Sequence, residues 1–573
     1  MDNTSIAKIF ENIANLLELK GDIPFKIRAY QRAARTIEHL PAPVSQLAAE
    51  GRLRELPGIG QELEEKIHEM LTTGDLVYYQ RLYSEFPEGI IHVMGVPGVG
   101  PKTASRLWKE LGVTTVDELE RAVEDGRVAA LPRMGEKTAE NILRQLRASR
   151  TKDQRVPIGH ALPVAQEIIA ALSPTPGLRN LTAAGSLRRY RETVGDVDII
   201  GTSDDPEPAI KRFTSLPLVS EVIMAGPQRA SVRLGNGLQV DLRLVPHDAF
   251  GSLLQHFTGS QAHNVVLREY AVKKGLSVSE YGITRADTGE RESFSEEEAV
   301  YTRLGLQYIP PEIREGGVEI ELAERGSIPR LVELSDIKGD LHDHTIWSDG
   351  HNTTEEMVEA ARARGYQYIA ITDHSAGRGI ANGLSVERLR EHIKEIRALN
   401  ERYGDIRIFT GSEVDIRADG SLDYPDEVLA ELDVVVASVH SAMGQEAARM
   451  TERIIKAMHN PHVDIIGHLT CRLLGEREPV ALDSEAIFRA AAATGTALEI
   501  NASPSRLDLK DTHIHRAREL GVMLVSSTDA HRVEHLDYMR FGVGIARRGW
   551  CEPSHILNTR PIAGVDAFFG PGR

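Results

Sequence analysis

The chain has 573 residues with 41% hydrophobic and 26% charged side chains, which is ordinary for a soluble globular protein. A chain of this length exceeds what one hydrophobic core supports, so several domains are predicted. The net charge of −17 excludes a general basic coat for nucleic acid, and no apolar run approaches the ~18 residues needed to span a bilayer.

The start of the chain and its cysteines indicate the compartment. The polar segment MDNTSIAKIF contains no signal-peptide core. Two cysteines, Cys471 and Cys551, cannot form a disulfide framework, and we interpret both as structural residues in a reducing environment. We therefore expect a cytoplasmic protein that does not contact a membrane.

Residues 1–150 are predicted to be helical. The segments IAKIFENIANLLELKG and FKIRAYQRAARTIEHL carry apolar residues at i, i+3 and i+4 spacing. A pattern of apolar-Pro entry, tight turn and helix then recurs as LPGIGQELEEKI at 56–67, VPGVGPKTASRLW at 96–108 and, more weakly, LPRMGEKTAENIL at 131–143. These units could serve packing alone, or they could present helix N-terminal amides to phosphate groups.

The repeated units resemble helix-hairpin-helix motifs. In the first two copies, Gly-x-Gly permits close backbone approach to a ligand. The resemblance implies contacts with the DNA backbone at Gly58, Gly60, Gly98, Gly100 and Lys102.

Residues 151–335 change to a pattern of strands interleaved with helices, which predicts an α+β region. Asp196 and Asp198 alternate with apolar residues in VGDVDII, so both carboxylates should lie on one face of a strand. Asp241 lies on the polar side of LQVDLRLV, which the turn Gly235-Asn236-Gly237 joins to RASVRL as a hairpin. Three such carboxylates could hold two Mg²⁺ ions for phosphoryl transfer.

The segments GSLRRYRETVGDVDII, QVDLRLVP and HFTGSQAHNVVLREYAVKKGLSVSEYGI, in this order, resemble the family X DNA polymerases, with similarity over about residues 1–310. The resemblance implies that Asp196, Asp198 and Asp241 bind two Mg²⁺ or Mn²⁺ ions and that Asp241 is the base for the primer 3′-hydroxyl. The implied nucleotide-binding residues are Gly185, Ser186, Arg189 and Gly195 for the triphosphate, and Phe257, Gly259 and Asn264 for the sugar and base. Arg268 is implied to contact the template. His256 replaces a tyrosine of the best-known member, which leaves the discrimination against ribonucleotides open.

From residue 338 strands and helices alternate repeatedly, which predicts a parallel α/β barrel. Potential metal ligands follow nearly every strand: His342, His344, Asp349, His374, Glu413, His440, His468, Asp529 and His531. Barrels place active sites at the carboxyl ends of their strands, and imidazole with carboxylate suits Zn²⁺, Mn²⁺ or Fe²⁺. Arg472, just after His468, is either a phosphate ligand or an ordinary surface residue.

The motifs HxHT, SDG, TDH and SDAH resemble the PHP phosphoesterase family from residue 338 to about 550. The resemblance implies three metals. His342, His344, Glu413 and Asp529 would hold one, Glu413, His440 and His468 a second, and Asp349, His374 and His531 a third.

The predicted fold class is therefore multidomain, with all-α helix-hairpin-helix domains, an α+β nucleotidyltransferase palm and a distorted TIM-like PHP barrel. The expected boundaries are 1–80 for a lyase-like helical domain, 81–150 for a duplex-binding subdomain, 151–260 for the palm, 261–315 for a nucleotide- and template-binding subdomain, 316–337 for a linker and 338–573 for the barrel.

The combined resemblance implies gap-filling DNA synthesis in repair together with metal-dependent 3′-5′ exonuclease or 3′-end processing, on gapped or nicked DNA and with dNTPs. We expect a monomer. Two alternatives stay open: the barrel could be a small-molecule phosphatase tethered to a polymerase, or the chain could be a DNA-end-binding scaffold with residual catalysis.

Processing of abasic sites is a further implication. Lys66 corresponds to the Schiff-base lysine of the polymerase family and Lys26 to a 5′-phosphate ligand. Glu62, Glu65 and Glu69 surround Lys66 along its helix, and their charge favours a protonated lysine, which cannot act as a nucleophile. We therefore expect weak lyase activity at best.

Overall fold

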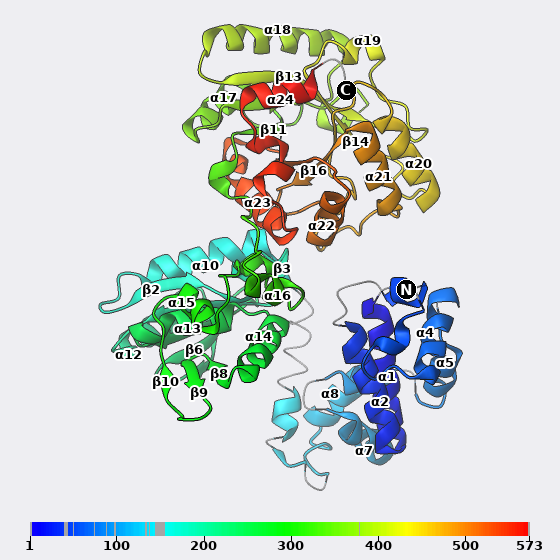
Figure 1. Ribbon diagram of the computed structural model, residues 1–573, viewed down its shortest axis with the longest axis vertical. Coiled ribbons are helices and arrows are strands. Elements are labelled where there is room, and N and C mark those ends of the chain that lie inside the picture. Colours follow the sequence, from blue (N-terminus) through cyan, green and yellow to red (C-terminus); the bar gives the residue numbers. More distant parts are fainter. Residues whose placement is uncertain are drawn as a thin grey trace. The chain divides into compact units, whose positions relative to one another are not determined.

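The computed structural model describes residues 3–38, 44–49, 51–73, 75–87, 89–96, 99–131, 134–136, 138–143, 155–377 and 379–570. These residues form two compact units (Figure 1). Unit 1 contains residues 1–155 and 316–318, and unit 2 contains residues 156–315 and 319–573. Among the described residues, no helix has the length and apolar character needed to cross a membrane.

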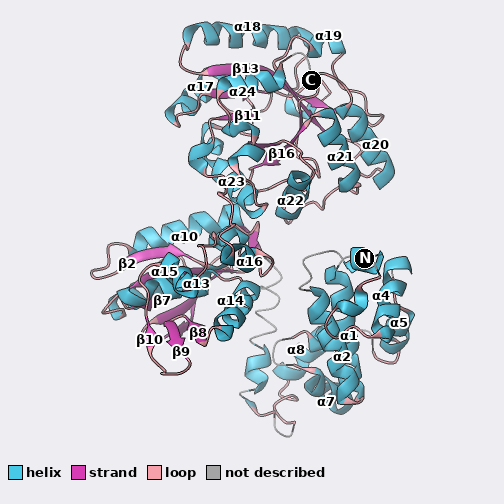
Figure 2. Ribbon diagram, in the orientation of Figure 1, coloured by secondary structure: helices cyan, strands magenta, loops and turns pink. Residues whose placement is uncertain are grey.

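Unit 1 is built from amphipathic helices, as the periodicity predicts (Figure 2). They are α1 (Asn3–Lys20), α2 (Pro24–Glu38), α3 (Val44–Ala49), α4 (Gln61–Thr73), α5 (Val77–Tyr83), α6 (Ile90–Met94), α7 (Pro101–Leu111) and α8 (Val116–Glu124). Phe10 of α1 meets Tyr30 of α2 edge to face, with ring centroids 5.6 Å apart. The third repeat lies partly outside the described residues.

The first half of unit 2 is organised around a five-stranded sheet with the order β2-β4-β7-β6-β5. The strands are β2 (Arg179–Ala183), β4 (Asp196–Thr202), β5 (Val219–Ala225), β6 (Arg229–Leu234) and β7 (Gln239–Val245). The hairpin expected between RASVRL and LQVDLRLV is present, because β6 and β7 pair antiparallel. A short pair, β1 (Val156–Pro157) and β3 (Thr193–Val194), lies outside this sheet, and the accompanying helices are α10 (Ile158–Leu172), α11 (Gly185–Arg188), α12 (Glu207–Thr214) and α13 (Phe250–Thr258).

A smaller α/β region follows. It contains α14 (Gln261–Lys273), β8 (Leu276–Ser279), β9 (Gly282–Arg285), β10 (Arg291–Glu292), α15 (Glu297–Leu304) and α16 (Glu319–Glu324). The buried Glu297 binds Arg188 through both carboxylate oxygens at 2.9 and 2.7 Å and Arg314 at 2.5 Å. Ile320 and Leu331, within the stretch expected to be a linker, are buried in the core of this region.

The second half of unit 2 is a seven-stranded parallel sheet in sequential order. The strands are β11 (Gly339–Asp343), β12 (Tyr368–Ile371), β13 (Arg407–Asp415), β14 (Val434–Ser438), β15 (Ile465–Ile466), β16 (Ala497–Asn501) and β17 (Leu524–Ser527). A bridge between Asp343 and Ala530 joins the first strand to the last, so the sheet is nearly closed. The predicted parallel barrel is confirmed.

Helices cover the outside of this barrel (Figure 2). They are α17 (Thr354–Ala363), α18 (Val386–Arg402), α19 (Asp426–Leu429), α20 (Ala447–Met458), α21 (Ser484–Thr494), α22 (Asp511–Glu519), α23 (Met539–Arg548) and α24 (Ile562–Phe569). Capping fixes where several begin: Thr353 accepts a hydrogen bond from the Glu356 amide, and Glu356 reciprocates in a capping box. Because all seven strands are parallel, their carboxyl ends lie at one rim of the barrel.

Candidate active sites

The three aspartates expected to act together lie on two paired strands. β4 and β7 are parallel, and Asp198 is the register partner of Asp241. Asp196 lies two residues before Asp198 on the same face. Burial and the carboxylates of Asp196 and Asp241 raise the pKa of Asp198 to about 7. A bound cation would relieve this repulsion between the carboxylates. Their oxygen atoms are donors that suit Mg²⁺ or Mn²⁺.

The Gly185-Ser186 turn lies directly against this carboxylate cluster. Gly185 has φ +58°, and a Cβ at this position would lie 2.2 Å from Asp198 Oδ2. Only glycine therefore satisfies both the left-handed backbone and the close approach. Gly185 and Ser186 begin α11, and Arg189 at its end lies beside Gly259, where a Cβ would lie 3.0 Å from Arg189 Nη1.

Other residues that were expected to bind the nucleotide lie around the aspartate cluster. Phe257 is half-buried and carries the Arg243 guanidinium 5.1 Å from its ring centroid, and the His256 ring lies 5.4 Å from the Phe257 ring. Asn264 donates to the His256 carbonyl at 2.8 Å and accepts from Gln255 at 2.8 Å, so its amide holds the end of α13. Gly195 immediately precedes β4, and Arg268 is exposed on α14.

The nine expected ligands of the barrel gather at the carboxyl rim. Three groups have ligand atoms within 4.8 Å of one another: His344, Asp349, His374 and His531; His342, His344 and Asp529; and His374, Glu413 and His440. His468 joins through Glu413, with Nε2 2.8 Å from Oε1. The grouping differs from the expected one in that His344 and His374 each belong to two groups.

Glu413 is the centre of the cluster. Its Oε1 lies 3.2 Å from His440 Nε2 and 2.8 Å from His468 Nε2, whereas its Oε2 lies 2.8 Å from His374 Nδ1. Oε2 is also 3.6 Å from His342 Nε2 and 3.7 Å from His344 Nε2. Glu413 is 1% exposed. A carboxylate whose two oxygens face different imidazoles is suited to bridging two cations.

The ring nitrogens at this rim fit metal ligation. Among the residues that the structure describes, His342 Nε2, His344 Nδ1 and His468 Nδ1 are buried without a hydrogen-bond partner. Buried polar atoms are normally satisfied, and each orphaned nitrogen is costly unless a ligand occupies its lone pair. The donor set of imidazole and carboxylate suits Mn²⁺, Zn²⁺ or Fe²⁺.

Sequence reasoning missed the residues that orient these ligands. Glu499 of β16 is fully buried, with Oε1 2.7 Å from His342 Nδ1, while Oε2 accepts from the His468 amide. Asp415 Oδ1 lies 2.6 Å from His440 Nδ1. Such carboxylates fix the tautomer and orientation of ligating imidazoles. An acidic residue inside the apolar strand ALEIN was the one available signal for Glu499.

Neither interpretation of Arg472 is supported. Its side chain is 8% exposed and donates to the carbonyls of Arg506 and Leu507. It also pairs with Glu192 at 2.7 Å, so it joins the barrel to the first half of unit 2. Arg506, which sequence reasoning did not consider, lies near the cluster with Nε 3.6 Å from Asp529 Oδ2 and is 19% exposed.

In unit 1, Gly58 and Gly60 line a cavity of about 550 Å³ together with Arg28, Arg32 and Arg54. Gly58 has φ +86°, and a Cβ there would lie 2.6 Å from Arg32 Cδ. The first repeat thus combines a turn that requires glycine with nearby guanidinium groups.

The second repeat is described in part. Gly100 is the N-cap residue of α7 and provides no side-chain cap, and Lys102 is exposed on the first turn of this helix. Gly98 lies outside the described residues. Uncapped amides at a helix N-terminus are available for water or an anion.

Lys66 of α4 lies in a half-enclosed cluster. Its Nζ is 2.5 Å from Glu62 Oε1 and 4.9 Å from the centroid of the Tyr78 ring, and its side chain is 12% exposed. Lys26 Nζ lies 5.3 Å from the same ring. Glu69, expected to share the face of Lys66, instead accepts from the Val77 amide at 2.7 Å. Lys66 is therefore an ion-pair partner of Glu62, and its side chain is largely enclosed.

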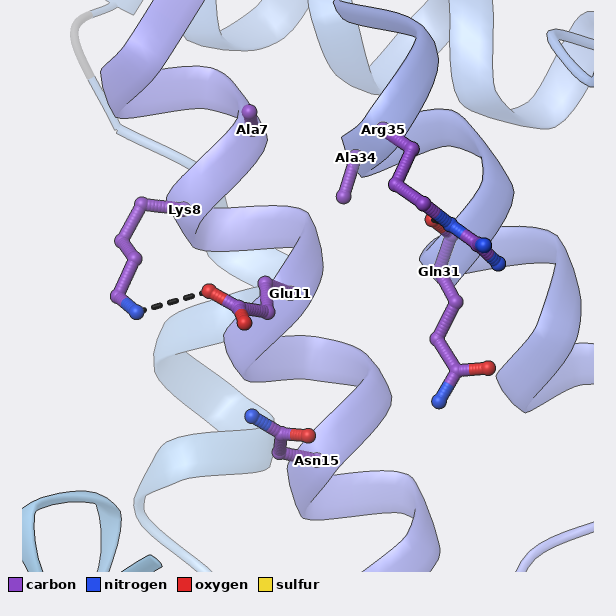
Figure 3. Close-up of a pocket in the computed structure, with 7 residues that line it drawn as sticks. All are labelled: Ala7, Lys8, Glu11, Asn15, Gln31, Ala34 and Arg35. Carbon is purple, nitrogen blue, oxygen red and sulfur yellow. Dashed lines mark hydrogen bonds and ion pairs between the residues drawn. The ribbon is translucent and has the colours of Figure 1, made fainter. Parts of the chain in front are cut away.

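A separate groove of about 540 Å³ runs between α1 and α2 (Figure 3). Lys8 and Glu11 on α1 form an ion pair of 2.8 Å, and Gln31 and Arg35 project from α2. The groove contains none of the expected site residues.

Comparisons with known proteins agree with this arrangement. A helix-hairpin-helix domain model matches residues 1–76, a SAM-like helix-hairpin-helix tandem residues 90–148, a DNA polymerase beta thumb residues 253–315 and a PHP domain residues 340–503. The chain is 43% identical over 570 residues to a DNA polymerase/3′-5′ exonuclease PolX of Bacillus subtilis (strain 168), with 99% of each chain covered.

Shorter relatives match over part of the chain. A probable phosphatase of Thermoanaerobacter sp. (strain X514) is 33% identical over 233 residues, which is 38% of this chain and 89% of that protein. A probable phosphatase of Shewanella sp. (strain MR-4) is 29% identical over 234 residues, covering 39% and 88%.

Proposed function

The chain belongs to the PolX family of DNA polymerase/3′-5′ exonucleases, and on this premise we propose that it fills short gaps in DNA and trims DNA 3′ ends at two separate sites in unit 2. One observation carries the proposal: the same chain holds three neighbouring aspartates beside the glycine turn at Gly185 and a cluster of nine candidate metal ligands at a barrel rim.

At the polymerase site, Asp196, Asp198 and Asp241 would hold two Mg²⁺ or Mn²⁺ ions. Bound cations there supply charge stabilisation to the attacking and leaving oxygens of an in-line displacement. Asp241 accepts the proton of the primer 3′-hydroxyl. Its Oδ2 already accepts a hydrogen bond from Gln239 at 3.0 Å, which orients the carboxylate.

The nucleotide subsite follows from the surrounding residues. Gly185, Ser186 and Gly195 offer backbone atoms close to the triad, and Arg189 provides a planar donor for phosphate oxygens. The sugar and base would pack against Phe257 and Gly259, with Asn264 fixing the end of α13 behind them. Arg268, which is exposed on α14, would contact the template strand.

At the barrel site, the nine ligands would hold three divalent cations, chiefly Mn²⁺. Cations bound there supply a nucleophilic hydroxide and stabilise charge on phosphorus oxygens. Glu413 would be shared between two of these cations, and Glu499 and Asp415 orient His342 and His440. Arg506 would bind a phosphate oxygen in place of Arg472. Gapped or nicked DNA would be held by the helix-hairpin-helix turns at Gly58, Gly60, Gly98, Gly100 and Lys102. A monomer and a cytoplasmic location remain predictions.

A second candidate function concerns the barrel. Two shorter relatives are probable phosphatases, which favours hydrolysis of small phosphomonoesters at the same cluster. A 3′-5′ exonuclease should release mononucleotides from an oligonucleotide far faster than it hydrolyses sugar phosphates at equal concentration.

The direct test is a gapped duplex with labelled primer, incubated with Mg²⁺ or Mn²⁺. With dNTPs the primer should extend to the end of the gap. Without dNTPs it should shorten from its 3′ end in Mn²⁺. Binding of the duplex with neither extension nor shortening would favour the scaffold alternative and contradict the proposal.

A further inference from the structure

Residues of the barrel half of unit 2 contact and hold the loop that follows α11 in the polymerase half. Arg548, the last residue of α23, donates from Nη1 to the carbonyl oxygen of Arg189 at 2.9 Å and to Glu315 Oε1 at 2.9 Å. Its Nε and Nη2 donate to Asp511 Oδ2 at 2.9 and 2.5 Å. The Arg548 side chain is 3% exposed. The guanidinium is thus fixed by the barrel and reaches the backbone of Arg189.

The Arg189 side chain is held within the same network. Its Nη1 donates to the Thr258 carbonyl, and its Nε lies 3.6 Å from Glu315 Oε1. Glu315 therefore stands between two guanidinium groups, those of Arg189 and Arg548. Arg548 Nη1 donates a hydrogen bond to Glu315 Oε1 at 2.9 Å. Because the carboxylate is held by Arg548 in this way, it does not form a full ion pair with Arg189.

Two further contacts from the barrel hold the next residues of the loop. Tyr190 has φ +52°, a conformation that a non-glycine residue adopts only when its surroundings impose it. The Tyr190 ring packs against Gly544 of α23, where a Cβ would lie 2.1 Å from Cδ1. Glu192 pairs with Arg472 at 2.7 Å. The barrel therefore contacts the loop at Arg189, Tyr190 and Glu192.

We infer that Arg548 of the barrel is a positioning residue for the polymerase site, and that the barrel completes the triphosphate subsite by aiming Arg189. The inference rests on the proposed function, in which Arg189 binds the triphosphate. A ligand must be placed within a fraction of an ångström to act at full strength, and a loop held from one side only is less well placed. Loss of Arg548 frees the Arg189 carbonyl and lets Glu315 draw the Arg189 guanidinium away from the nucleotide.

The chain offers a matched control. Arg547 lies next to Arg548 at the same interface, and it pairs with Glu312 at 2.7 Å and donates to the Val332 carbonyl at 3.0 Å. Among the described residues, the hydrogen bonds and ion pairs of Arg547 go to Glu312 and Val332 and do not involve Arg189 or Glu315. The Glu312 carbonyl oxygen also accepts from Arg548 Nη1 at 3.3 Å, but it is a backbone atom. Arg547→Gln thus removes a comparable interface ion pair and leaves the Arg548 hydrogen bonds to the Arg189 carbonyl and to Glu315 in place.

The test measures steady-state nucleotide addition to a gapped duplex by the full chain. Arg548→Gln should raise the KM for dNTP at least fivefold with kcat within twofold, while 3′ trimming keeps its parental rate. Arg548→Lys should restore part of the affinity, and adding Glu315→Gln to Arg548→Gln should lower the KM again. Arg547→Gln should keep the parental KM, even where its melting temperature falls as far as that of Arg548→Gln.

An equal KM in the Arg548→Gln and Arg547→Gln proteins would overturn the inference. Arg189→Gln, measured in parallel, distinguishes failure of this inference from failure of the proposed function. A raised KM in Arg189→Gln with a parental KM in Arg548→Gln sinks only the positioning role. A parental KM in Arg189→Gln removes Arg189 from the triphosphate site and overturns both. If Arg548→Gln does not fold, Arg548→Lys takes its place: a KM for dNTP above that of Arg547→Gln supports the inference, and an equal KM overturns it.

Discussion

Asp198 and Asp241 are register partners on the parallel strands β4 and β7, so their carboxylates project from one face of the sheet. This face also carries the Gly185 turn, which approaches Asp198 so closely that no side chain fits. A barrel with its own cluster of ligands follows in the same unit. The two sites use different residues, so their chemistry should separate.

The first prediction is that separation. Asp198→Ala removes a cation ligand and should lower nucleotide addition by at least about 100-fold, while 3′ trimming continues. His344→Ala should do the reverse, because its imidazole belongs to two ligand groups of the barrel. Asp204→Ala and His459→Ala, both at exposed positions, are the controls. If either active-site change abolished both activities in a folded protein, the two-site assignment would be wrong.

The second prediction concerns metal content. Gently purified protein should carry close to three barrel metals, one for each ligand group. Glu413→Gln should lose more than one of them, because the two Glu413 oxygens face different sets of imidazoles. Glu427→Gln, at an exposed position on α19, should lose none. Elemental analysis that finds a single barrel metal in the parent protein would contradict the trinuclear assignment.

The ligands could be predicted from the sequence because they obey a simple geometric rule. Each of His374, His440 and His468 follows a short apolar strand, and parallel strands bring their carboxyl ends to one rim. Period-two alternation likewise predicted that Asp196 and Asp198 share a face. The fold class is confirmed for the same reason: strand and helix periodicity is a local property.

Long-range contacts could not be predicted in this way. Arg472 pairs with Glu192, 280 residues earlier, and Arg548 binds the Arg189 carbonyl, 359 residues earlier. Nothing near either arginine in the sequence indicates that it is buried. Glu499 and Asp415 were missed because a buried acid that orients a histidine looks, in sequence, like any polar residue of a strand.

A third prediction follows from the buried pair of Glu297 with Arg188 and Arg314. Burial alone would raise the pKa of Glu297, but Arg314 and Arg188 lower it from 4.5 to about 2. The depressed pKa means that this carboxylate stabilises the fold above about pH 4.5 and that the stabilisation is lost as pH falls toward 2. The shift corresponds to about 3 kcal/mol at neutral pH.

Glu297→Gln should therefore lower the melting temperature of unit 2 at pH 7, and the difference from the parent should shrink steadily between pH 5 and 3. Scanning calorimetry over this range measures both effects. Glu298→Gln, an exposed neighbour on α15, should show neither. A difference that stayed constant with pH would show that the charge of Glu297 is not what stabilises the fold.

The last prediction concerns lyase chemistry at Lys66. A Schiff-base nucleophile needs a neutral amine, whereas Glu62 Oε1 lies 2.5 Å from Lys66 Nζ and stabilises the charged ammonium. The Lys66 side chain is nevertheless only 12% exposed and lies beside Tyr78. The hydrogen bond from Lys66 lowers the pKa of Glu62, so the carboxylate beside the amine is ionised. We therefore expect weak trapping by borohydride on a 5′-deoxyribose-phosphate substrate, and a severalfold increase in Glu62→Lys, which removes the carboxylate and attracts the phosphate.

Glu65→Lys changes the charge of α4 equally, but Glu65 pairs with Gln61 rather than Lys66, so it should give a smaller gain. Strong trapping in the parent that disappears in Lys66→Ala would show that the enclosed surroundings of Lys66 outweigh its acidic neighbour.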